Sequence, residues 1–358
     1  MLHGISRWAA TGATIALGAL ALNGCGSEAQ SQALGSTSTA TVPVTPSLPT
    51  DRGVVDEQGV RTFEVTASEF TQKISNFPLQ TATVWGYNGS TPGPTLIANE
   101  GEAIRIILNN NLPPGENSDT TIHLHGLHQP NEFDGVAGIS QPDPIPPGGS
   151  FTYGPFVPRH SGTFSYHSHT HTAVQDLRGL SGMIVILPQN ELSSEHVDKD
   201  YVMTLQQFAP PSEGALVNPF PGGTGGFPFS TINGKTGDAS GETINIDEGD
   251  RVRIRFYNAS NVSHTMHLHG HDEVLVSKNG HPVPITTETS QQVGPGDFFE
   301  IDWTADNPGN WIFHCHIPHH TSNMQQSGYN GSPVGMTRIF HYNGFQDVRD
   351  EYFSYDGG

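Results

Sequence analysis

The chain has 358 residues, a length that suggests two domains. Hydrophobic residues make up only 34% of it, with 42 glycines and 27 prolines, a mixture that favours all-β sandwiches with many turns over helical or α/β folds. The formal net charge of −20 argues against nucleic acid as a partner. An acidic surface of this kind either attracts metal cations or serves solubility alone.

The first 25 residues resemble an export signal. Arg7 precedes an apolar stretch at 8–22 that is too short to span a membrane comfortably. The sequence LNGC, ending at Cys25, resembles a bacterial lipobox, in which the cysteine is lipidated and becomes the first mature residue. The alternative is a plain cleaved signal with a coincidental cysteine. We therefore expect a protein of the bacterial periplasm or cell envelope, anchored to lipid through Cys25 if the first interpretation holds.

Only two cysteines are present, Cys25 and Cys315, so a disulfide framework is excluded unless these two pair. If Cys25 carries lipid or is removed, Cys315 is a lone thiol in an oxidising compartment. Metal ligation is one role for such a thiol.

Residues 26–52 are rich in Ser, Thr, Ala, Pro and Gln, a composition that predicts a flexible tether. Short β-rich runs separated by Gly- and Pro-rich turns follow this segment. This alternation is typical of a β-sandwich. The expected strands are 61–65, 81–87, 103–108, 163–166 and 183–187, then 201–206, 243–246, 252–256, 298–303, 311–313 and 337–341. The segment 208–230 predicts a long loop.

The two series of strands are copies of one another. EGEAIRI at 100–106 matches EGDRVRI at 248–254, and GTFSYHSH at 162–169 matches GNWIFHCH at 309–316 without gaps. A duplication at a domain-sized period predicts two like domains. We place them at 53–190 and 198–358.

Most of the 19 histidines fall in four clusters, at 123–125, 167–171, 264–269 and 314–320, and each cluster contains His-x-His. Residues i and i+2 of a strand share a face, so each pair can direct two imidazoles at one point. One such pair alone is usually a surface accident, but four in register with a duplication predict metal binding. A pocket between the two kinds of domain could gather all eight imidazoles.

The last cluster adds a second arrangement. His314 and His316 face one way along the strand, and Cys315 between them faces the other. Cys315 with His264 and His320 would supply the His₂Cys ligand set of a blue-copper electron-transfer site. The shared strand would join that site by covalent bonds to the metals held by His314 and His316.

These motifs resemble those of the multicopper oxidases, in the phrases WGYNGSTPGPTL, HLHGLH, YHSHTHTAVQDLRGLSG, HTMHLHGH and FHCHIPHH. The size, with a ligand cysteine only in the second domain, resembles the small two-domain bacterial laccases. The resemblance implies two cupredoxin-like Greek-key β-sandwiches and four copper ions per functional unit. The ligands it implies are His123 and His267 for the type 2 copper; His125, His167, His169, His269, His314 and His316 for the type 3 pair; and His264, Cys315 and His320 for the type 1 copper.

The axial ligand of the type 1 copper is left open by the resemblance. A Met, Leu or Phe usually lies five residues after the last histidine, where this chain has Gln325, and Met324 is one residue early. If residues 324–334 are an insertion, Met336 lies directly before the strand at 337–341. We prefer Met336 for that reason.

Asp134 matches the family's acidic residue near the type 2 copper, where it would orient water and relay protons; the alternative is a turn-forming Asp-Gly. Relatives often carry a second acid where this chain has Pro318, so a second relay must come from elsewhere, such as His319. The histidines outside the ligand pattern are expected at the surface or in support of the ligands: His128, His160, His171, His196, His281 and His341.

The first domain carries Ser168 where the second carries Cys315, so it should hold no type 1 copper, which disfavours copper nitrite reductase. The resemblance implies a laccase-like oxidase that couples oxidation of phenolic or aromatic donors to reduction of O₂ to water. It also implies a homotrimer with the trinuclear copper sites between chains. The alternatives are a metallo-oxidase of Mn(II), Fe(II) or Cu(I) and a non-catalytic copper carrier. Only six methionines argue against a dedicated Cu(I) oxidase.

Overall fold

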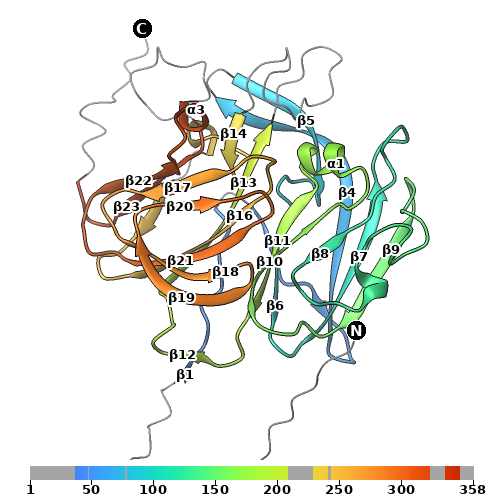
Figure 1. Cartoon of the computed structure of the whole chain (residues 1–358), viewed down its shortest axis with the longest axis horizontal. Coiled ribbons are helices and arrows are strands. Elements are labelled where there is room, and N and C mark those ends of the chain that lie inside the picture. Colours follow the sequence, from blue (N-terminus) through green and yellow to red (C-terminus); the bar gives the residue numbers. More distant parts are fainter. Residues whose placement is uncertain are drawn as a thin grey trace, which may run out of the picture. The chain divides into compact units, whose positions relative to one another are not determined.

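The structure is a computed structural model, and it describes residues 37–46, 48–76, 79–208, 229–240, 243–322 and 335–346. Within these ranges the chain forms two successive β-sandwiches with a few short helices (Figure 1). The predicted all-β fold is confirmed, and every strand expected from the sequence lies inside an observed strand. No helix of the described part is long and apolar enough to cross a membrane. The export signal, residues 209–228 of the expected loop and residues 323–334 lie outside the described residues.

The first sandwich has two sheets. One has the strand order β2-β6-β11-β10-β8, and the other β3-β4-β7-β9 with β5 paired to β4. The elements are β2 (Thr50–Asp51), β3 (Val54–Val55), β4 (Val60–Asn76), β5 (Leu79–Tyr87), β6 (Thr95–Asn99), β7 (Ala103–Asn111), β8 (His123–His125), η1 (Asn131–Phe133), β9 (Ser150–Phe156), β10 (Gly162–His167), α1 (Thr172–Arg178) and β11 (Ser181–Leu187).

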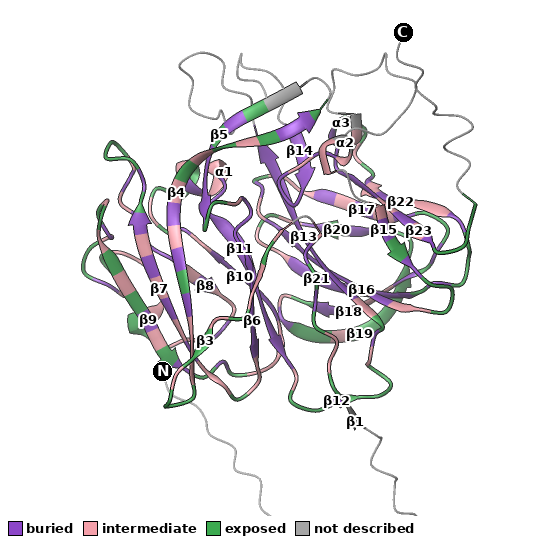
Figure 2. Ribbon diagram, turned by 180° about the vertical axis from the view of Figure 1, so that it is seen from behind, coloured by how far each residue is buried: buried purple, intermediate pink, exposed green. Residues whose placement is uncertain are grey.

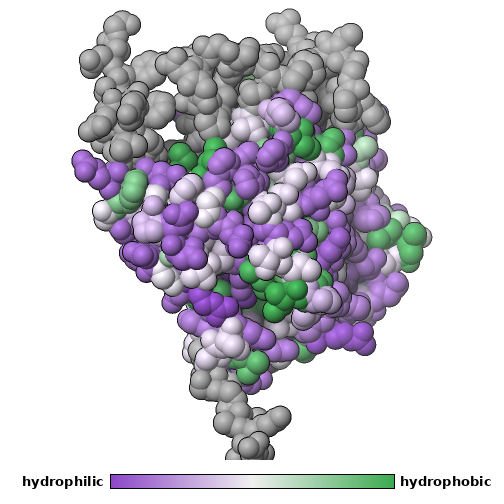
Figure 3. Space-filling view, turned by 60° about the vertical axis from the view of Figure 1, so that its left-hand side comes forward, coloured by the Kyte–Doolittle hydropathy of each residue, from purple (hydrophilic) through white to green (hydrophobic). Residues whose placement is uncertain are grey.

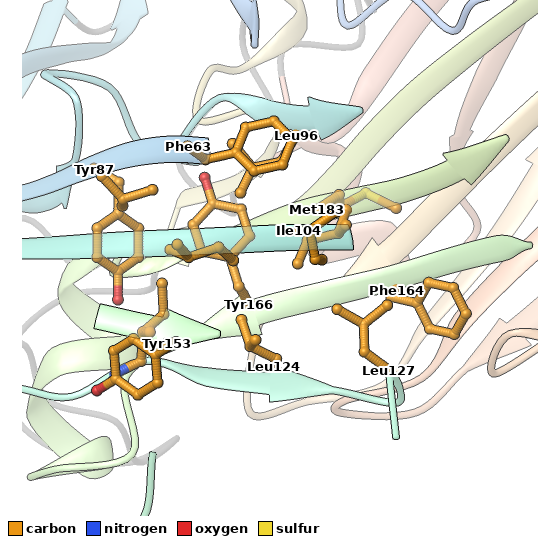
Figure 4. Close-up of a cluster of buried hydrophobic side chains, with 14 of the residues drawn as sticks. Phe63, Tyr87, Leu96, Ile104, Leu124, Leu127, Tyr153, Phe164, Tyr166 and Met183 are labelled. Atoms are coloured by element: carbon orange, nitrogen blue, oxygen red, sulfur yellow. The ribbon is translucent and has the colours of Figure 1, made fainter. Parts of the chain in front are cut away.

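Side chains from both sheets fill the core of the first sandwich. Alternation along β7 points Ile104, Ile106 and Leu108 inward, as the period of two on a strand requires. They join Phe63 of β4 and Tyr166 of β10 in one buried cluster (Figure 4). The core thereby fixes β8 and β10, the strands that carry the first two histidine clusters.

The second sandwich repeats this plan. Its sheets have the orders β14-β13-β16-β21-β18-β19 and β15-β23-β22-β17-β20. The elements are β12 (Glu191–Leu192), which pairs with β1 (Thr37–Ser38), then β13 (Lys199–Phe208), β14 (Phe229–Ile232), α2 (Gly237–Ser240), β15 (Thr243–Ile246), β16 (Arg251–Asn258), β17 (His264–Leu268), β18 (Glu273–Lys278), β19 (His281–Glu288), β20 (Gln291–Val293), β21 (Phe298–Thr304), β22 (Asn310–Cys315), α3 (Pro318–Ser322) and β23 (Thr337–Tyr342).

A buried polar network joins the two sandwiches. Arg255 of β16 donates to Asp200 Oδ2 and to Glu300 Oε1, each at 2.8 Å, and to Thr163 Oγ1 of the first sandwich, also at 2.8 Å. Thr163 donates in turn to Glu300 Oε1 at 2.5 Å. All four residues are buried. Their strands, β10, β13, β16 and β21, are largely purple, the colour of buried residues, in Figure 2. Apolar contact adds to this junction, because Phe298 of β21 belongs to the core of the first sandwich.

The prediction of a flexible tether at 26–52 is wrong for those residues of the segment that the structure describes. Residues 37–38 pair with β12, and residues 50–51 pair with β6. Between them, Val44 N donates to the Asp200 carbonyl and the Val44 carbonyl accepts from Val202 N, both at 2.9 Å. The composition is poor in large apolar side chains, but these bonds use only backbone groups, which composition does not reveal.

The described surface is largely hydrophilic, in keeping with the net charge of −20. Figure 3 shows one face on which hydrophobic side chains occur in small separate groups. The most exposed large apolar side chains of the described residues are Ile139, Val54 and Ile285, on different elements.

Candidate metal centres

A buried Cys–His–His group lies at one end of the second sandwich. His264 begins β17, Cys315 ends β22 and His320 lies on α3. Cys315 Sγ is 3.8 Å from His264 Nδ1 and 3.4 Å from His320 Nδ1, and the two Nδ1 atoms are 3.1 Å apart. All three side chains are almost inaccessible to solvent. The type 1 ligands inferred from the resemblance therefore come together with their donor atoms facing one another.

Hydrogen bonds fix the tautomer of His264. Ser260 Oγ donates to Asn258 Oδ1 at 2.7 Å, so its lone pair accepts from His264 Nε2 at 2.8 Å. The proton of His264 is then on Nε2, and Nδ1 keeps a free lone pair toward Cys315.

The protonation states of His264, His320 and Cys315 bear on whether this group can bind a cation. Burial lowers the pKa of His264 to about 3 and that of His320 to about 4, so both imidazoles are neutral. Burial also raises the pKa of the Cys315 thiol, so its thiolate form needs the positive charge of a bound cation. Copper would supply that charge, because neutral imidazole and thiolate are its preferred ligands here.

Met336 lies beside this group, whereas Met324 and Gln325 lie outside the described residues. The Met336 carbonyl accepts from Cys315 N at 3.1 Å, and Met336 N donates to the His320 carbonyl at 3.0 Å. Its side chain is fully buried in the core cluster that contains Cys315. Met336 as the axial ligand stays a prediction.

Four histidines converge at the first sandwich. His123 and His125 lie on β8, His167 ends β10 and His169 follows it. The ring of His123 is 5.7 Å from that of His125, 5.3 Å from that of His167 and 5.4 Å from that of His169, between centroids. Cross-strand pairing explains this, because His167 lies opposite His123 in the β8–β10 ladder.

Hydrogen bonds to backbone carbonyls orient two of these rings, those of His123 and His167. His123 Nδ1 donates to the Asp134 carbonyl at 2.8 Å, and His167 Nδ1 donates to the Ser168 carbonyl at 2.8 Å. Since a carbonyl can only accept, both rings carry their proton on Nδ1 and offer Nε2 to a metal. Burial lowers the pKa of His125 to about 4, so this ring is neutral as well.

Two carboxylates support this group. Asp134 Oδ1 lies 3.3 Å from His123 Nδ1, and its role near the type 2 copper stays a prediction. Asp176 on α1, which sequence reasoning missed, places Oδ2 3.5 Å from His167 Nδ1. Burial raises the pKa of Asp176, and its Oδ1 is buried without a hydrogen-bond partner. Asp176 lies within the quoted segment YHSHTHTAVQDLRGLSG, but its position on α1 beside His167 is set by the fold and not by local spacing.

The second sandwich holds the matching half. His267 lies on β17 opposite His314 on β22, and their rings are 5.6 Å apart. His269 Nε2 and His314 Nε2 face each other at 3.0 Å, and the His316 ring is 5.6 Å from that of His267. His314 Nδ1 donates to the Cys315 carbonyl at 2.8 Å, the same bond that His167 makes. We call the two histidine groups the first and second half-sites.

The half-sites do not meet within one chain. Among the described residues, no candidate ligand group and no ring contact combines a histidine of the first half-site with one of the second. Cys315 lies between His314 and His316, so the buried group and the second half-site are consecutive along the backbone.

Two further features concern residues that the sequence left unassigned. His271 is buried, donates from Nδ1 to the His269 carbonyl at 3.0 Å and has Nε2 2.6 Å from the Tyr342 hydroxyl, so it orients the loop that carries His269. The suggested relay residue His319 lies on α3 with its ring 4.4 Å from that of His320, and its role as a second relay stays a prediction. His196 and His341 bond to Glu191 and Asn310, and His171 is exposed at the start of α1.

The first sandwich has an oxygen-rich counterpart of the Cys–His–His group. Ser168, at the position of Cys315 in the duplication, hydrogen-bonds to the Gln175 side chain, as does Thr120 at 2.8 Å. Gln175 Nε2 donates to two backbone carbonyls at 2.7 Å. This pocket offers hydroxyl and amide groups in place of sulfur and imidazole.

Comparison with known proteins agrees with this geometry. Family models described as multicopper oxidase match residues 69–191 and 208–325. Laccase-4 of Thanatephorus cucumeris is 30% identical over 72% of this chain and 51% of its own length, and Laccase-2 of the same organism is 35% identical over 54% and 35%. The chain thus spans about a third to a half of such curated relatives.

Solved structures of multicopper oxidases are similar to this protein over a larger part of the chain. The multicopper oxidase mgLAC is 30% identical with a TM-score of 0.71, covering 83% of this chain and 90% of its own. The blue copper oxidase from Nitrosomonas europaea is 26% identical with a TM-score of 0.68, covering 83% and 92%. These similarities confirm that the sandwiches are cupredoxin-like.

Proposed function

The chain belongs to the multicopper oxidase family, and from that premise we propose that it is a laccase-like enzyme that oxidises phenolic or aromatic donors with O₂. Four one-electron oxidations and four protons would reduce one O₂ to two waters. The observation that carries the proposal is the buried group of Cys315, His264 and His320, joined through one tripeptide to His314 and His316.

Copper is the cofactor of this family, and bound copper would supply one-electron redox chemistry and charge stabilisation for O₂. The Cys–His–His group would hold the type 1 ion. His123 and His267 would hold the type 2 ion. The type 3 pair would take the remaining six histidines of the half-sites: His125, His167, His169, His269, His314 and His316.

The chain's own residues would then perform three tasks. The backbone from Cys315 to its two neighbours gives electrons a short covalent path to the second half-site. Hydrogen bonds to Nδ1 hold His123 and His167 with Nε2 directed inward. Asp134 Oδ1, which accepts from Gln129 Nε2 at 2.8 Å and lies beside His123, would hold and pass protons from solvent.

Separate half-sites imply more than one chain. A first half-site needs a second half-site to complete a trinuclear cluster, and the two do not meet within the described chain. A head-to-tail contact that pairs the first half-site of one copy with the second half-site of the next would close into a ring. We propose a homotrimer with three such clusters. His267 lines a groove of about 1120 Å³ to which both sandwiches contribute residues.

An exported form is part of the proposal. The apolar segment at 8–22 and the sequence ending at Cys25 favour a bacterial periplasmic or envelope protein with a lipid anchor.

The donor class is tested by O₂ uptake of the copper-loaded protein with a phenol, Mn(II), Fe(II) and Cu(I) compared side by side. We expect the phenol to support the highest turnover, with four donor molecules oxidised per O₂ consumed. Uptake only with a metal ion would favour the metallo-oxidase alternative, for which the net charge of −20 is the supporting observation. No uptake with any donor would contradict the enzyme proposal and leave a copper carrier.

A further inference from the structure

A fifth group of potential ligands lies apart from the copper half-sites. His128 follows β8, His160 lies between β9 and β10, and His281 begins β19 of the second sandwich. One ring nitrogen of each lies within 4.8 Å of the others. The ring of His160 is 4.8 Å from that of His281 and 6.1 Å from that of His128, between centroids. We call these three residues the junction triad, since they bridge the two sandwiches.

His160, the central histidine of the junction triad, has one ring nitrogen that could bind a ligand. His160 Nδ1 donates to the Ser161 carbonyl at 2.8 Å, so its lone pair is on Nε2. That Nε2 is buried and has no hydrogen-bond partner among the described residues. His167 and His314 make the same bond to the carbonyl of the following residue, at the same 2.8 Å. His160 is therefore oriented by the same kind of hydrogen bond as two proposed copper ligands, His167 and His314. Its buried Nε2 is an acceptor without a partner among the described residues, and such an atom needs an explanation.

The backbone fixes the positions of the two outer members of the junction triad, His128 and His281. His128 has φ 56°, in the left-handed region that costs a non-glycine residue energy and often marks a functional position. His281 follows the turn Asn279-Gly280, whose φ values of 51° and 77° suit a tight hairpin. Asn279 locks this turn by donating to Asp297 Oδ1 at 2.9 Å and accepting from Phe298 N at 2.9 Å.

Glycines bring the two sandwiches close at this point. A Cβ on Gly280 would lie 2.6 Å from the Phe164 ring, and one on Gly162 would lie 3.1 Å from the Gly280 carbonyl oxygen. The hairpin tip of one sandwich is thus seated against the β10 strand of the other. His160 and His281 therefore lie on opposite sides of a tightly packed contact between the two sandwiches.

We propose that the junction triad binds one Zn²⁺ ion and cross-links the two sandwiches of the same chain. Tetrahedral coordination at metal–nitrogen distances of about 2.0–2.1 Å places ligand nitrogens about 3.4 Å apart, so rotamer adjustments of the exposed His128 and His281 would close the present spacing. Three imidazoles leave a fourth position for water. The exposure of His128 and His281 gives the ion access from solvent.

The probe is Zn²⁺ added to the copper-loaded full chain, followed by dialysis and elemental mass spectrometry. We expect one zinc per chain above the copper content, together with a higher thermal unfolding midpoint. In His281→Gln and His160→Gln, zinc affinity should fall by at least about 100-fold, because even loss of a ligand's hydrogen-bonding partner costs about 10- to 100-fold. The blue absorption and O₂ uptake should be unchanged, so the outcome is independent of the proposed oxidase function.

His196→Gln is the matched control, because His196 bonds to Glu191 outside every candidate ligand group of the described residues. This variant should bind zinc as the native chain does. Failure of the native chain to take up zinc would overturn the proposal. Equal zinc uptake by the native chain and by both triad variants would overturn it as well.

Discussion

Replacement of Cys315 by serine is expected to remove the blue absorption and reduce O₂ uptake with a phenolic donor to the uncatalysed background. Serine is nearly isosteric, so the core cluster around this fully buried position should survive. Its hydroxyl is not a thiolate, however, and it cannot bind copper(II) as a blue site does. The visible spectrum, O₂ uptake and copper content of purified Cys315→Ser give the measurement.

The chain offers its own control for this change. Cys25→Ser removes the only other cysteine, which lies in the proposed export segment, and the purified variant should keep both colour and activity. The copper content of Cys315→Ser should fall by the type 1 ion alone. Normal O₂ consumption by Cys315→Ser would refute the assigned path of electrons.

Replacement of Arg255 by methionine should destabilise the protein by about 3–5 kcal/mol, because removing one partner of a buried ion pair leaves uncompensated charge. Arg255 is only 4% exposed and contacts two carboxylates, Asp200 and Glu300, at 2.8 Å. Without the guanidinium, these carboxylates must take up protons or remain as buried charges. Loss of the bond to Thr163 also weakens the junction between sandwiches. Denaturant unfolding followed by circular dichroism measures the change.

Lys199→Met serves as the comparison for this experiment. The Lys199 ammonium is 36% exposed and lies 3.9–4.0 Å from two carboxylates, a surface arrangement worth no more than about 1 kcal/mol. A similar unfolding midpoint for the Arg255 and Lys199 variants would contradict the structural role of the buried network.

The sequence predicted those features that depend on local period and repetition. His-x-His spacing on strands placed His123 and His125 on one face, and the duplication aligned His167 with His314. In the structure, His167 lies opposite His123 as His314 lies opposite His267. The same duplication contrasted Ser168 with Cys315, and the structure surrounds Ser168 with Gln175 and Thr120. Local pattern is sufficient wherever the ligands lie on paired strands.

Other features depend on tertiary packing and could not be predicted. Asp176 reaches His167 only because α1 folds back over the strand end, and His271 reaches Tyr342 across 71 positions of sequence. The junction triad combines residues of three separate segments, and no single motif contains all three. Residues expected to form a tether bond through their backbone to β6, β12 and β13, and composition says nothing about backbone partners.

The central claim is that each trinuclear copper cluster joins the first half-site of one chain to the second half-site of another. The direct test is to co-express His125→Gln with His269→Gln under different affinity tags and to purify assemblies that contain both. Each variant alone should be inactive. A closed ring of three with both variants has one intact pairing, so we predict about one third of native O₂ uptake. No uptake by such mixed assemblies, with full activity of a native monomer, would contradict the account.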